Sequence, residues 1–170
     1  MSEGFSFTCT VCGKVHEGLP DLGFDYPIYY HQLNDAERSE QARLTTDTCV
    51  INDEDFFIRG CLEIPVHGRS IPFTYGVWVT LSRDNFERYE ELYEDKHGRE
   101  QEPPYFGWFS NQVPGYAETL NLKTNVYLRP YPTRPRIELE PTDHQLSIDQ
   151  RNGITVERLK ALLEANEHPK

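Results

Sequence analysis

The residues whose types and spacing most clearly suggest chemistry lie in the stretch CTVCGKVH, from Cys9 to His16. Two cysteines two residues apart, followed at once by Gly13, have the shape of a zinc knuckle, in which a tight turn points both thiolates at one ion. Glycine tolerates the backbone twist that such a turn needs. A thioredoxin-like redox pair would instead begin a helix, and Gly13, Gly18 and Pro20 disfavour a helix here. The motif therefore predicts a metal site.

A tetrahedral zinc needs four ligands, and the sequence offers three more candidates in His16, Cys49 and Cys61. A hairpin that pairs Ile51 with Phe56 places Cys49 opposite Ile58, so that Cys49 and Cys61 face opposite sides of the sheet and do not share one ion. We therefore predict a structural zinc with the ligands Cys9, Cys12, His16 and Cys49. Cys61 replaces His16 if the imidazole points away. The alternative is that Cys49 and Cys61 are buried thiols of apolar strands.

A second group with potential chemistry runs from Glu138 to His144. Its carboxylates could serve a metal-assisted hydrolase, but Glu138 and Glu140 alternate with apolar residues as in an ordinary half-buried strand. Asp143 and His144 are adjacent, so in an extended chain they point to opposite sides and form no dyad. No H-E-x-x-H motif and no glycine-rich phosphate loop is present. We assign no catalytic residue and no cofactor other than zinc.

A basic segment interrupts an otherwise acidic chain. Between Glu118 and Glu138 there is no acid, and the segment carries four cations interleaved with tyrosines: Lys123, Arg129, Arg134 and Arg136. Arginine forks suit a phosphate or an acidic partner. The favoured interpretation is that these arginines pair with the 28 acids of the chain itself.

The elements that must position these residues indicate an α+β fold with a mainly antiparallel sheet and a few peripheral helices. Residues 1–170 are expected to form one domain, with residues 9–16 as the zinc-knuckle-like turn. Ser82 and Thr155 are expected to cap helices, and Asn34 or Asp35 a third that continues to about Leu44. The expected strands cover residues 5–8, 48–51, 56–66, 73–81, 105–109, 122–128 and 136–139.

Composition sets the cellular context. The net charge of -11 disfavours nucleic acid and acidic membranes as partners. The N-terminus does not read as a signal peptide, and the apolar runs are too short to cross a bilayer, so we expect a soluble cytoplasmic protein. In a reducing compartment, four cysteines are more typical of metal ligands or buried thiols than of disulfides.

Six segments resemble one bacterial family in the same order: CTVCGKVH, DTCVI, FFIRGCLEIPV, GVWVTLS, FGWFSN and RPRIELEPTDHQLSIDQRNGIT. The family is domain of unknown function 2199, and the resemblance covers essentially the whole chain. It implies no activity and transfers no catalytic residue.

We therefore expect a zinc-stabilised domain that is not an enzyme and acts by binding another protein. A sharper version is an immunity-type inhibitor whose acidic helix face, from Glu87 to Glu94, covers a basic partner. The alternative is a metal-assisted hydrolase with a pocket near the zinc or near Glu138 to His144.

Overall fold

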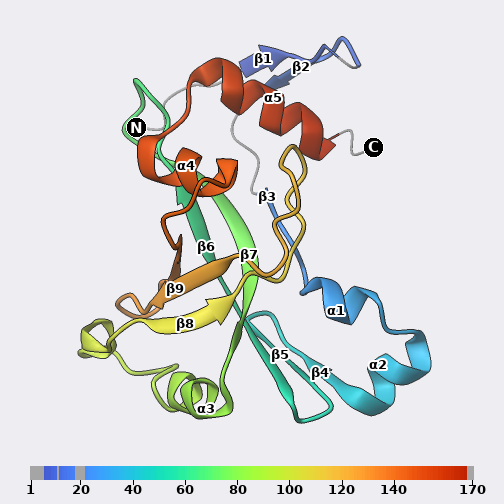
Figure 1. Cartoon of the computed structure of the whole chain (residues 1–170), viewed down its shortest axis with the longest axis vertical. Helices are drawn as coiled ribbons and strands as arrows, with labels where there is room; N and C mark the ends of the chain where they lie inside the picture. Colours follow the sequence, from blue (N-terminus) through green and yellow to red (C-terminus); the bar gives the residue numbers. More distant parts are fainter. Residues whose placement is uncertain (1–5, 11, 18–21, 168–170) are drawn as a thin grey trace.

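The computed structural model describes residues 6–10, 12–17 and 22–167 (Figure 1). It confirms the α+β class. In chain order the elements are β1 (Ser6–Thr8), β2 (Val15–Glu17), β3 (Leu22–Gly23), α1 (Ile28–His31), α2 (Asp35–Gln41), β4 (Ala42–Leu44), β5 (Thr48–Ile51), β6 (Asp55–Ile64), β7 (Phe73–Leu81), α3 (Arg83–Glu91), the 3-10 turn η1 (Arg99–Gln101), β8 (Tyr105–Trp108), β9 (Lys123–Tyr127), β10 (Arg136–Leu139), α4 (Gln145–Asn152) and α5 (Val156–Glu167).

The main sheet has the strand order β3-β7-β6-β10-β9-β8, with β5 added to β6 and β4 to β5. Its centre is the long antiparallel pair β6 and β7. The expectation of a mainly antiparallel sheet needs correction, because the sheet is mixed: β3 pairs in parallel with β7, and β10 in parallel with β6. The strand β10 thus lies between β6, to which it is parallel, and β9, to which it is antiparallel.

The hairpin of β5 and β6 differs from the predicted register by one residue. Cys49 pairs with Phe57 rather than with Ile58. The reason lies in the turn, where Asn52 and Asp53 both have positive φ, at 56° and 52°, and the pairing already begins at Asp55. Side chains alternate along a strand, so this shift places Cys49 on the same sheet face as Phe57 and Cys61. The expectation that Cys49 and Cys61 face opposite sides of the sheet was therefore wrong.

The sheet curls until β8 meets β7. Ser110 N–H donates to the Trp78 carbonyl at 2.9 Å, and Val79 and Phe109 form an antiparallel bridge. Gly107 lies so close to β7 that a Cβ there would stand 2.4 Å from the Thr80 carbonyl oxygen. Only glycine permits this close approach of the two strands. Because β8 contacts β7, the strands β6, β7, β8, β9 and β10 form a barrel-like ring around the main core.

The predicted helix caps at Ser82 and Thr155 are confirmed, since the hydroxyl of each accepts a backbone N–H three residues later. Asn34 caps α2 as expected, but the helix ends at Gln41 and the chain passes into β4. The sequence did not predict α4, whose cap is the imidazole of His144. Across the described ranges, no helix combines the length and apolar character needed to cross a membrane.

Candidate functional site

The cysteine motif forms the turn of the β1–β2 hairpin. Cys9 N–H donates to the Lys14 carbonyl and Gly13 N–H to the Cys9 carbonyl, both at 2.9 Å, while Gly13 has a φ of +74°. Cys9 is buried in the main core and Cys12 is exposed. The backbone of His16 pairs with that of Phe7, but its side chain lies outside the described part of the structure.

The structure does not bring Cys49 to this hairpin. The hairpin packs beside α5, where the hydroxyl of Thr10 donates to the Glu164 carboxylate at 2.7 Å. Cys49 is fully buried in a separate cluster with Trp78, and Figure 1 shows β5 at the other end of the molecule. Burial raises the pKa of the Cys49 thiol to about 12, so it stays neutral at pH 7. Among the side chains that are described, no three His, Cys, Asp or Glu residues gather as metal ligands.

In the segment from Glu138 to His144, the carboxylate of Glu138 and the imidazole of His144 have structural partners. His144 Nδ1 accepts the Leu146 N–H at 3.0 Å, and His144 Nε2 lies 3.0 Å from the Glu118 carbonyl oxygen. Because the carbonyl only accepts, Nε2 carries the proton and the imidazole is engaged on both sides. Glu138 lies 3.3 Å from Arg136 in a partly exposed ion pair.

Two cations of the basic segment, Arg129 and Arg134, line a cavity of about 320 Å³. Its walls come from the end of α3, from η1, from the turn between β4 and β5, and from the loop between β9 and β10. The residues are Asp47, Tyr89, Leu92, Tyr93, Arg99, Leu128, Arg129, Tyr131, Pro132, Thr133, Arg134 and Pro135. This size lies at the lower end of the range for small-molecule pockets.

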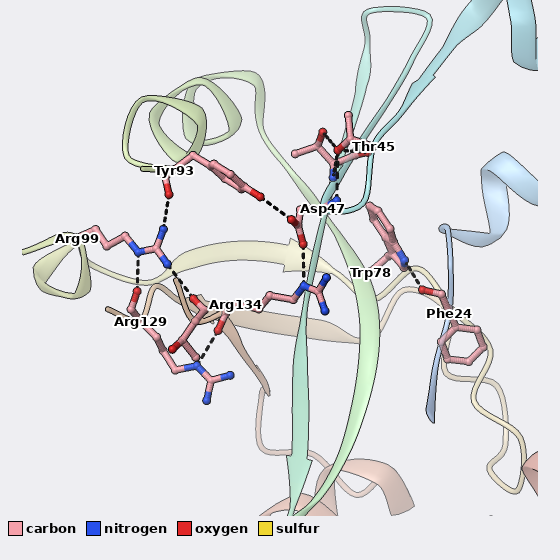
Figure 2. Close-up of polar contacts among 10 residues, drawn as sticks. Phe24, Thr45, Asp47, Trp78, Tyr93, Arg99, Arg129 and Arg134 are labelled. Carbon is pink, nitrogen blue, oxygen red and sulfur yellow. Dashed lines mark hydrogen bonds and ion pairs between the residues drawn. The ribbon is translucent and has the colours of Figure 1, made fainter. Parts of the chain in front are cut away.

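Arg99, on η1, holds together two other walls of the cavity, the end of α3 and the loop between β9 and β10. Its side chain is only 7% exposed, and its guanidinium donates to three carbonyl oxygens, those of Tyr93 at 2.7 Å, Arg129 at 2.6 Å and Thr133 at 2.8 Å (Figure 2). Within the part of the chain that the structure describes, it forms no ion pair with a carboxylate. The arrangement fixes the loop against the end of α3, and the acceptors that Arg99 meets among the described residues are carbonyl groups, which carry no net charge.

Asp47 connects the turn between β4 and β5 to the end of α3 and to the loop between β9 and β10. Its carboxylate accepts Arg134 Nε at 2.7 Å and the Tyr93 hydroxyl at 2.5 Å (Figure 2). These contacts raise the pKa of Tyr93 and of Arg134, because the ionised carboxylate favours the protonated form of each. The two terminal nitrogens of Arg134 have no hydrogen-bond partner in the described ranges, and its side chain is 40% exposed.

Arg129 connects the cavity to β6. Its Nε donates to the Arg134 carbonyl at 2.7 Å, and its Nη1 donates to Glu63 at 2.6 Å. Arg129 and Arg134 both lie close enough to Cys61 to lower the pKa of its thiol, but burial has the larger effect and raises that pKa overall. Cys61 is therefore a neutral, partly exposed thiol close to two guanidinium groups.

The interpretation that the basic segment pairs with acids of the same chain is confirmed for three arginines: Arg129, Arg134 and Arg136. Even so, three cations and one carboxylate line the cavity. The lack of acids between Glu118 and Glu138 had already indicated Arg129 and Arg134 of this cavity. Asp47, Tyr93 and Arg99 were missed because they lie far apart in the sequence and in no motif.

No curated protein matches the chain, and no solved structure does. Residues 8–154 match the family described as "Uncharacterized protein conserved in bacteria (DUF2199)". The match spans most of the 170 residues and includes the cysteine hairpin from Cys9 onward, the cavity and α4. The chain therefore belongs to the DUF2199 family.

Proposed function

We propose that the protein is a binding protein whose ligand presents an anionic group to the arginine cavity. The main support comes from Arg134, whose terminal nitrogens have no partner in the described residues although its Nε donates to Asp47. A guanidinium fixed at one edge presents its remaining N–H groups in a defined direction, which suits carboxylate or phosphate oxygens.

The charge around Arg134 supports the same proposal. Arg99 and Arg129 line the cavity with it, and Lys96 lies 5.8 Å from the ring of Tyr131, which is also a cavity residue. In a chain of net charge -11, a local excess of positive charge attracts anions that the rest of the surface repels. The tyrosine and proline walls supply apolar surface for the remainder of a small ligand.

Titration calorimetry at low ionic strength, with benzoate and phenyl phosphate as probes, tests the proposal. We expect Arg134→Gln to weaken binding about tenfold or more, because a hydrogen bond to a charged group contributes about 1.5–3 kcal/mol. Arg43→Gln is the matched control, since Arg43 also pairs with an aspartate but is 70% exposed and lies outside the cavity. Equal affinity of the Arg134 variant and the parent protein would refute the proposal.

We also retain, as proposals, a structural zinc and a basic protein partner. The exposed acids of α3 and its C-terminal end, Glu87, Glu90, Glu91 and Glu94, support a basic protein partner by their accessibility. For zinc, the turn from Cys9 to Gly13 supports a site at the hairpin, which would use ligands other than Cys49. Metal analysis, described below, tests it.

A further inference from the structure

Arg59 lies on β6 beside the cavity, because its backbone N–H donates to the carbonyl of the cavity residue Asp47 at 2.9 Å. It has the same parity on β6 as Cys61, so the two side chains leave the same face of the sheet. Its guanidinium folds over Gly76, where a Cβ would stand 3.1 Å from Nη2 and 3.3 Å from Nε. Gly76 is the direct partner of Cys61 on β7, so the guanidinium reaches the row formed by Cys61 and Gly76.

Arg59 meets no counter-ion among the described residues. In the described ranges its side chain makes no hydrogen bond and no ion pair, and its Nε is buried without an acceptor. By contrast, Arg129, Arg134 and Arg136 each meet a carboxylate. A buried donor without a partner is costly, and such groups are rare in folded proteins. The terminal nitrogens of Arg59 also have no acceptor among the described residues, and unlike Nε they are not buried, so they are the groups that an acceptor from outside the chain could reach.

Two other guanidinium groups, those of Arg129 and Arg134, lie close enough to the Cys61 thiol to lower its pKa, and Arg59 lies over Gly76, the partner of Cys61 on β7. The Cys61 N–H donates to the carbonyl of Pro135 at 2.8 Å, and Pro135 is a wall of the cavity. The cavity and the row around Cys61 are therefore neighbours.

We propose that Arg59 completes a three-arginine site with Arg129 and Arg134, and that the ligand group bound there is a phosphoryl group. This inference rests on the proposed function and names its ligand class. Asp47 and Glu63 pair with Arg134 and Arg129, whereas Arg59 and Arg99 pair with no carboxylate of the described residues. A phosphoryl dianion matches two positive charges and offers three acceptor oxygens, whereas a carboxylate matches one charge with two oxygens.

The test compares phenyl phosphate with benzoate, which share a ring and differ in the anionic group. We expect Arg59→Gln in the full chain to weaken phenyl phosphate about tenfold and benzoate less than twofold, because only the phosphoryl group has an oxygen left for a third arginine. Arg43→Gln again serves as the control for a lost surface charge. Binding of phenyl phosphate should also tighten from pH 5 to pH 7, since its second ionisation has a pKa of about 6.

Gly76→Ala supplies a second variant that keeps every charge. Its methyl carbon would stand 3.1 Å from Arg59 Nη2, so the guanidinium must shift by a few tenths of an ångström, and we expect a selective loss of phenyl phosphate that is smaller than with Arg59→Gln. It also serves if Arg59→Gln does not fold. If Arg134→Gln weakens both probes while the Arg59 and Gly76 variants bind like the parent, the inference is wrong and the proposed function stands. An equal loss of both probes on changing Arg59 overturns the phosphoryl class. Absence of binding by the parent protein overturns the proposed function itself.

Discussion

Replacing Arg99 by methionine tests whether this one side chain fixes the cavity wall. Methionine retains most of the aliphatic length but removes three charge-assisted hydrogen bonds, to the carbonyls of Tyr93, Arg129 and Thr133. At about 1.5 kcal/mol each, the lower end for a hydrogen bond to a charged group, the three bonds contribute about 4.5 kcal/mol. Water entering the adjacent cavity can satisfy some of the exposed carbonyls. We therefore expect a loss of about 3 kcal/mol in the free energy of unfolding, within the range of large single-site effects.

Urea denaturation followed by tryptophan fluorescence measures this loss, since Trp78 is buried and Trp108 is partly exposed. Arg43→Met is the control, because an exposed ion pair contributes about 1 kcal/mol or less. Arg99→Lys should recover part of the stability, as an ammonium group can donate to the same carbonyls with less suitable geometry. A variant Arg99→Met within about 1 kcal/mol of the parent, which is the effect of an ordinary substitution, would show that the wall does not depend on these bonds.

Three further predictions concern other parts of the molecule. Gly107→Ala should destabilise the protein by about 1–3 kcal/mol, the usual cost of overpacking, because its Cβ would clash with the Thr80 carbonyl; thermal unfolding measures this, and an unchanged midpoint would contradict the close contact of β8 with β7. The Cys49 thiol ionises at its ordinary pKa of 9.0 in the unfolded chain and at about 12 in the folded protein, so its contribution to stability is complete below pH 9 and is lost as the pH rises toward 12. Cys49→Ala should therefore show a shallower decline in the free energy of unfolding between pH 8 and pH 10 than the parent protein. An identical slope would contradict the raised pKa of Cys49. Protein purified without added zinc should contain about one zinc per chain by elemental analysis, and the double variant of Cys9 and Cys12 should contain none; substoichiometric metal in the gently handled parent would contradict the zinc prediction.

Local patterns were sufficient to predict most of the elements. The run FTYGVWVTL forms β7 with the predicted bounds, because its apolar and β-branched residues leave no competing helical period. Ser82 and Thr155 marked helix starts, since a hydroxyl before an amphipathic segment satisfies the first free N–H groups. The helix α4 was missed because its cap is a histidine, a residue outside the usual capping set.

Properties that depend on distant pairing were not predictable in this way. The parallel pairing of β6 with β10 depends on where the chain returns after several elements, and no local pattern encodes it. The candidate site was predicted in part: Arg129 and Arg134 were identified from the lack of acids around them. Arg59 and Arg99 looked like ordinary charged residues, because being unpaired is a property of the folded surroundings.

The parallel pair of β6 and β10 also determines when during synthesis the site can exist. A nascent chain that has emerged only as far as β9 already contains Arg59, but Arg129 and Arg134 take their places only when β10 docks beside Cys61. Pairing between strands so distant in sequence is a slow, late event in folding. A ligand that needs all three arginines binds the completed sheet and not its precursors, so by mass action it would favour maturation of newly made chains. Cellular abundance of the protein would then follow the supply of its ligand.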